Sequence, residues 1–178
     1  MSSEYGVSYS EMVAKQVLDH YLGGFKKLDN VKPDWLQGME IDRYYPTLGI
    51  AIEFQGDQHY RTVPGMHQDP TDFRKQLDID TKKRQLIEGR GIKLHTINFL
   101  DLDRYKIQGL VRTLVQEGKL YAEKNNFNDE VRRLQNIRLD QEPDFRLMRK
   151  ADGIARVRKS YYKENRNLSW WKRLLRKL

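Results

Sequence analysis

The chain has 178 residues, no cysteine and a formal net charge of +8 at neutral pH. This length fits one catalytic domain with an appendage, and the lack of cysteine excludes disulfides and thiolate metal sites. The chain does not begin with a signal-peptide pattern, and no apolar run approaches the roughly 18–20 residues of a membrane span. We therefore expect a cytoplasmic protein of a bacterial, archaeal or phage-infected cell.

A first helix is predicted over residues 11–22. Ser10 is a typical N-cap residue, apolar side chains follow it at helical spacing, and Gly23 and Gly24 end the pattern. The next segment, residues 25–36, is ambiguous and is compatible with a short edge strand.

A hairpin is predicted next, with strands over residues 39–45 and 50–55 and a turn at Pro46-Thr47-Leu48-Gly49. If the turn is regular, paired positions place Asp42 directly opposite Glu53. Like charges at such a position are destabilising, so two apposed carboxylates need a reason. A bound Mg²⁺ or Mn²⁺ ion supplies one, because both ions prefer oxygen ligands. The alternative is that one acid simply faces solvent.

The polar residues 56–72 predict a loop, residues 72–90 a helix and residues 92–97 a strand. A strand, a crossover helix and a second strand indicate a parallel pairing. The chain is thus predicted to be α/β, with a core over residues 1–100 and a helical extension over residues 101–178. Two helices are expected early in the extension, with apolar positions at Ile107, Leu110, Val111, Leu114, Val115, Val131, Leu134 and Ile137.

The end of the extension is basic, with nine lysines and arginines against two acidic residues over residues 151–178. Cations interleaved with aromatic residues are typical of nucleic-acid-binding surfaces, although a solubilising tail is an alternative. The candidate DNA contacts are Arg156, Arg158, Lys159, Lys163, Arg166, Lys172 and Arg173. A last short helix carries Trp171 and three leucines. Docking on the core or on a second copy is favoured for it, and lying along DNA or binding a membrane or a partner groove are the alternatives.

Residues 40–46 (EIDRYYP) and 50–60 (IAIEFQGDQHY), followed by residues 80–83 (DTKK), resemble the PD-(D/E)XK nuclease superfamily. The likeness covers about residues 8–100 and is greatest to the branch of very-short-patch repair and E-D-x-H-D phage homing endonucleases. It implies a restriction-endonuclease-like αβββαβ core and a metal-dependent DNA-cutting activity.

The resemblance also implies a set of site residues. The positions that match its pattern are Glu11, Asp42, Glu53, His59 and Asp80, with Asp78 as a rival for the last position. Asp42 and Glu53 would hold the metal, and Glu11 could hold a second ion. Gln55 departs from the pattern, because E-x-K places a lysine there. Either Lys83 from the following helix or His59 would then take over the role of that lysine.

Two classes of function remain. The first is an Mg²⁺-dependent endonuclease of the homing, repair, restriction-like or junction-resolving type, with DNA as its partner and no organic cofactor. The second is a non-catalytic nucleic-acid-binding module or a mobile-element accessory subunit on a degenerate nuclease fold, which Gln55 favours. A homodimer is compatible with both.

Overall fold

The structure is a computed structural model and describes residues 9–55, 70–98, 102–157 and 159. Its elements in chain order are α1 (Tyr9–Leu22), β1 (Leu28–Val31), the short 3₁₀ helix η1 (Asp34–Leu36), β2 (Ile41–Tyr45), β3 (Ile50–Gln55), α2 (Pro70–Glu88), β4 (Lys93–Asn98), α3 (Arg104–Lys124) and α4 (Asn128–Gln135). A further helix covers residues 145–157. The predicted α/β class is confirmed.

The four strands form one sheet in the order β1-β2-β3-β4. The first two pairings are antiparallel, as the predicted hairpin requires. β3 and β4 are parallel, and α2 is the crossover helix between them. The ambiguous segment before the hairpin therefore contains the edge strand β1. Ser10, predicted as an N-cap, already lies inside α1, so that detail was wrong.

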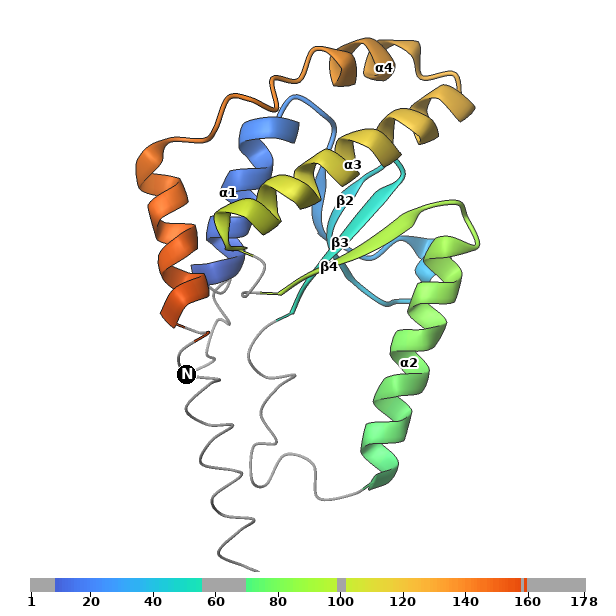
Figure 1. Ribbon diagram of the computed structural model, residues 1–178. Helices are drawn as coiled ribbons and strands as arrows, with labels where there is room; N and C mark the ends of the chain where they lie inside the picture. The colour runs from blue at the N-terminus through green and yellow to red at the C-terminus, as the bar shows by residue number, and fades with distance from the viewer. Residues whose placement is uncertain (1–8, 56–69, 99–101, 158, 160–178) are drawn as a thin grey trace, which may run out of the picture.

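Helices cover both faces of the sheet (Figure 1). α1, α3 and the helix of residues 145–157 lie on one face, whereas α2 lies on the other. Ile50 and Ile52 belong to the larger hydrophobic cluster under α1 and α3, and Ala51 belongs to the smaller cluster under α2. This alternation follows from the pleat of β3, whose successive side chains point to opposite faces.

The extension shares its core with the first part of the chain. The predicted stripe of α3 is buried at Ile107, Val111 and Leu114, and Met148 and Ala151 join the same cluster. The predicted helix around Leu134 ends earlier than expected, because i→i+3 hydrogen bonds close α4 at Gln135 and leave Ile137 in the following turn. The Trp171 helix lies outside the described residues. In the part of the chain that the structure describes, no helix is long and apolar enough to cross a membrane.

Arg43 joins three elements and is the most deeply buried charged side chain described, with 2% of its surface exposed. From β2, its guanidinium donates to Asp29 of β1 at 2.7 and 3.1 Å and to Asp19 of α1 at 2.7 Å. It also donates to the backbone oxygen of Lys15 at 3.2 Å. A buried arginine with so many partners fixes the position of α1 on the sheet.

We expect Arg43→Met to lower the free energy of unfolding by about 3 kcal/mol at pH 7, because Asp19 and Asp29 lose their shared cation. Urea unfolding followed by circular dichroism measures this loss. Lys27→Met is the matched control, since Lys27 contacts Asp19 at 2.5 Å but is partly exposed. The control should cost less than about 1 kcal/mol. Equal losses in the two variants would contradict the anchoring role of Arg43.

The effect of Arg43→Met should also depend on pH. Burial raises the pKa of Asp29, but the hydrogen bond and the charge of Arg43 outweigh it and bring the pKa below its ordinary value of 3.8. Such a carboxylate stabilises the fold above its unfolded pKa, and the stabilisation is lost as the pH falls through the folded pKa. The difference between wild type and variant should therefore be constant from pH 7 to about pH 5 and shrink below about pH 4.

Candidate active site

The register of the hairpin brings the two predicted metal-binding acids together. Arg43, Tyr44 and Tyr45 pair with Ile52, Ala51 and Ile50 across β2 and β3, and one further step of the same register places Asp42 opposite Glu53. The predicted register is therefore confirmed. The turn between the strands has four residues and includes Gly49 with φ +59°, which glycine adopts without strain.

Asp42 is half-buried at the point where β2 ends its pairing with β3. Its Oδ2 accepts a hydrogen bond from the backbone N–H of Phe54 at 2.7 Å. Burial raises the pKa of Asp42 above its ordinary value despite that hydrogen bond, and the negative charge of Glu11 adds to the rise. The carboxylate is thus held in place, and burial outweighs the hydrogen bond and the charges of Lys83 and Lys15 in setting its pKa.

Glu53 has one oxygen with a partner and one without. Its Oε2 lies 2.7 Å from the Nζ of Lys83, whereas its Oε1 is buried and accepts no hydrogen bond from the residues described. Burial raises the pKa of Glu53; the hydrogen bond from Lys83 opposes the rise, and the charge of Asp42 adds to it. A buried carboxylate oxygen without a partner lowers stability. This oxygen can therefore still coordinate a cation or accept a hydrogen bond.

Lys83 reaches this pair from α2, and its side chain is only 15% exposed. It lines a pocket of about 410 Å³ together with Glu53, Gln55 and Asp80. Gln55 stands at the carboxyl end of β3, and the exposed Asp80 lies one turn before Lys83 on α2. The structure thus gathers four of the predicted site residues around one pocket on the α2 face of the sheet.

Glu11 approaches from the opposite helix. It forms an ion pair with Lys15 at 2.7 Å, one turn along α1, and Lys15 also lies over the ring of Phe54 at 5.5 Å. Within residues 9–55, 70–98 and 102–157, no three His, Asp or Glu side chains form a group that could hold an ion. The carboxylates that lie together are therefore Asp42 and Glu53, with Glu11 close enough to affect the pKa of Asp42.

Some predicted site residues fall outside the described part of the chain, and others were not foreseen. His59 lies outside it, as do Arg158, Lys163, Arg166, Lys172 and Arg173, whereas Arg156 and Lys159 are described. Sequence reasoning missed Lys15, although its spacing of four residues from Glu11 on a predicted helix indicates a pair. It also missed Lys106, which no local pattern connects with the basic end of the chain.

Comparison with known proteins gives two viral relatives. Uncharacterized protein 094L of Frog virus 3 (isolate Goorha) is 37% identical over 86 residues, which are 48% of this chain and 54% of the viral protein. Uncharacterized protein 307L of Invertebrate iridescent virus 6 is 29% identical over an alignment of 83 residues, and the match covers 40% of this chain and 42% of that protein. The chain spans about half the length of the curated relatives it matches. No family model and no solved structure matches the chain.

The raised pKa values of Asp42 and Glu53 predict that the two ionised acids lower the stability of the fold when no metal is present. A carboxyl group whose folded pKa exceeds its unfolded pKa weakens the fold where it is ionised, and this penalty vanishes below the unfolded pKa. In EDTA at pH 7, we expect Asp42→Asn to be more stable than wild type by up to about 1 kcal/mol. The asparagine oxygen can still accept the hydrogen bond from Phe54.

Urea unfolding at pH 7 and at pH 4.5 tests this prediction, because the gain should shrink at the lower pH. Glu40→Gln is the matched control, since Glu40 belongs to the same hairpin but lies 3.6 Å from Lys32 on the surface. The control should change the stability by less than about 0.5 kcal/mol. A loss of stability in Asp42→Asn at pH 7 would refute the repulsion between the two acids.

Proposed function

We propose that the chain is an Mg²⁺-dependent deoxyribonuclease, an endonuclease that hydrolyses phosphodiester bonds in DNA. The observation that carries the proposal is the half-buried pair of Asp42 and Glu53, with an unpartnered oxygen on Glu53 and a lysine from α2 beside it. Two apposed acids cost stability, and a site that binds a divalent cation is a physical reason to keep them. The order of one helix, three strands, a helix and a strand also agrees with the proposed restriction-endonuclease-like core.

The donor set suits Mg²⁺, with Mn²⁺ as a substitute. Asp42 and Glu53 would hold the ion, and Mg²⁺ commonly takes only one or two carboxylates, with water and substrate phosphate completing its shell. The buried Oε1 of Glu53 lacks a hydrogen-bond partner among the described residues and would fit such an ion. When bound, the metal lowers the pKa of water and stabilises negative charge on the phosphoryl group. Glu11 is close enough to affect the same site electrostatically.

Lys83 is our candidate for the role that E-x-K enzymes give to the lysine replaced here by Gln55. Its ammonium lies 2.7 Å from Glu53, although it comes from α2 and not from β3. From there it can neutralise a phosphate oxygen, which an uncharged glutamine amide cannot do, or orient the attacking water. The hydrogen bond from the N–H of Phe54 would hold the carboxylate of Asp42 in a fixed orientation at the proposed metal site.

A non-catalytic DNA-binding module is the second candidate, and Gln55 is the observation that favours it. The two proposals differ in what they require of the acids, because binding to phosphates gains nothing from two apposed negative charges. Metal-dependent nicking of supercoiled plasmid distinguishes them.

We expect Asp42→Asn and Glu53→Gln to abolish plasmid nicking in Mg²⁺ while DNA binding survives, because each removes metal charge and leaves the basic surface intact. Lys83→Gln should slow nicking by about 100-fold, the usual cost of losing one electrostatic contact to a transition state. The control is Lys82→Gln, since Lys82 is its exposed neighbour on α2. Wild-type nicking rates in a folded Asp42→Asn or Glu53→Gln variant would refute the proposed site.

Metal binding can also be measured without cleavage. Millimolar Mn²⁺ should raise the Tm of the wild type, because a ligand that binds only the folded state stabilises it. The Asp42→Asn variant should respond much less, and Glu40→Gln should respond like wild type. Scanning calorimetry measures the Tm, and a short DNA duplex is added because its phosphates supply oxygen ligands that the protein alone does not provide. No shift in the wild type under these conditions would favour the non-catalytic module.

A further inference from the structure

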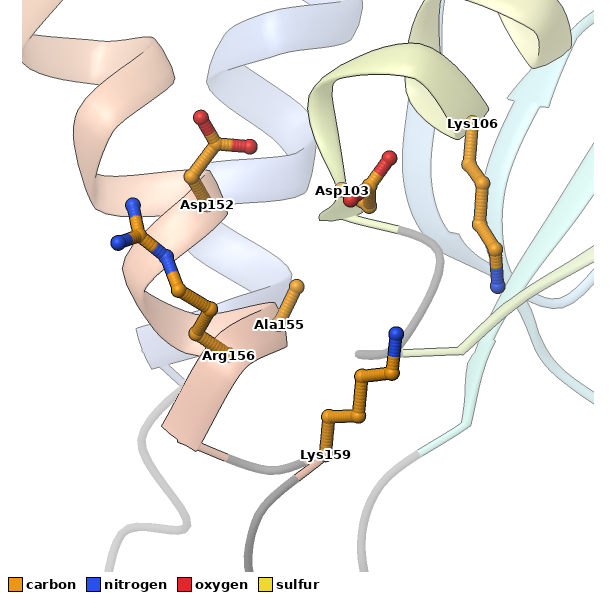
Figure 2. A pocket seen from close by; sticks show the side chains of 6 residues that line it. All are labelled: Asp103, Lys106, Asp152, Ala155, Arg156 and Lys159. Atoms are coloured by element: carbon orange, nitrogen blue, oxygen red, sulfur yellow. The ribbon is translucent and has the colours of Figure 1, made fainter.

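A second pocket, of about 210 Å³, lies between the start of α3 and the helix of residues 145–157 (Figure 2). Its lining residues are Asp103, Lys106, Asp152, Ala155, Arg156 and Lys159. The sequence marks Arg156 and Lys159 only as members of a basic segment. The fold adds Lys106 from a helix that begins more than forty residues earlier, so the pocket joins cations from two elements.

The two acids of this pocket are engaged by the backbone of α3. Asp152 accepts a hydrogen bond from the N–H of Arg104 at 2.9 Å, and Asp103 accepts one from the N–H of Tyr105 at 3.1 Å. Together they satisfy N–H groups in the first turn of α3 that have no partner within the helix. Their role is thus to cap α3 and to tie the helix of residues 145–157 to it.

The cations of the pocket come from two separate elements. Figure 2 shows the side chain of Lys106 running down from α3 and that of Lys159 rising from the end of the other helix, while Arg156 extends along its own helix. Among the residues described, no ion pair joins Arg156 or Lys159 to a carboxylate. Two lysines from separate elements that line one pocket suit an anion with several acceptor oxygens, such as a phosphate diester.

The location of the pocket connects it with the candidate active site. Asn98 ends β4 and pairs with Gln55, the last residue of β3. Asp103 follows Asn98 by five residues, and a chain of that length spans at most about 18 Å. Since successive base pairs of duplex DNA rise by about 3.4 Å, the pocket is within roughly five base-pair steps of the carboxyl end of β3. This distance is short enough for one DNA duplex to span it.

We propose that Lys106 and Lys159 bind a backbone phosphate of DNA, with Arg156 contributing at the edge of the pocket. The inference deepens the proposed function and rests on it in one respect, that the bound phosphate flanks the one that is cleaved. Such a contact carries no sequence information but sets the register of the duplex on the protein. It therefore determines which phosphate lies at Asp42 and Glu53.

The test compares the full chain with the double variant Lys106→Gln/Lys159→Gln. Binding to a fluorescent 20-base-pair duplex is measured by anisotropy in EDTA between 50 and 200 mM NaCl. Two lost phosphate contacts should reduce the slope of log K against log salt by about 1.8 and lower the affinity at 100 mM on the order of tenfold. The matched control is Lys119→Gln/Lys124→Gln, which removes the partly exposed Lys119 and the exposed Lys124 from the other end of α3, about 20–27 Å from Lys106.

A reduced slope for the Lys106/Lys159 variant, with an unchanged slope for the control and equal Tm values, supports the inference. A slope equal to that of the wild type, or a reduction matched by the control, overturns it. Plasmid nicking in Mg²⁺ separates this outcome from that of the proposed function. Nicking by the wild type with no change in slope overturns the phosphate site alone, whereas a reduced slope without any nicking supports the site and refutes the nuclease.

Discussion

The pairing register between β2 and β3 is the constraint on which the candidate site depends. A slip of one residue would move every side chain of one strand to the other face and separate Asp42 from Glu53. The turn at Gly49 fixes the register locally, and the packing of α3 on this turn holds it in place. A Cβ added at Gly49 would lie 2.2 Å from the ring of Tyr121, so the helix packs directly on the turn.

The two faces of the sheet then contribute different groups around the acids. α1 is fixed to the sheet by Arg43, and it carries Glu11 and Lys15. α2 contributes Lys83, because this helix is the crossover between the parallel strands β3 and β4. Opposite charges therefore approach Asp42 and Glu53 from both sides, yet burial still keeps the pKa of each acid above its ordinary value.

The carboxyl end of the parallel pair β3 and β4 is also where the second pocket lies, because α3 begins soon after β4. In sheets with parallel strands, ligands commonly bind beyond this edge, where the chain leaves the sheet and side chains of several elements converge. The hydrophobic cluster that includes Ile107, Met148 and Ala151 holds α3 and the helix of residues 145–157 together. The cations on these helices therefore have a fixed place relative to the sheet.

The sequence by itself determined what depends on neighbours along the chain. Alternation and the turn at Gly49 predicted the hairpin, and with it the apposition of Asp42 and Glu53, because register in a short hairpin is set by its turn. The crossover helix and the parallel pairing followed from the order of apolar patterns. Boundaries such as the start of α1 and the end of α4 were less accurate, since local hydrogen bonds at helix ends decide them.

Only the tertiary structure decided which distant side chains meet. Lys83 contacts Glu53 across thirty residues, Arg43 joins α1 to β1, and Lys106 shares a pocket with Lys159. Each of these contacts depends on how a helix packs against the sheet or against another helix. Periodicity in the sequence indicates which face of a helix is buried. The packing of that helix against its neighbours decides which of their residues each long polar side chain contacts.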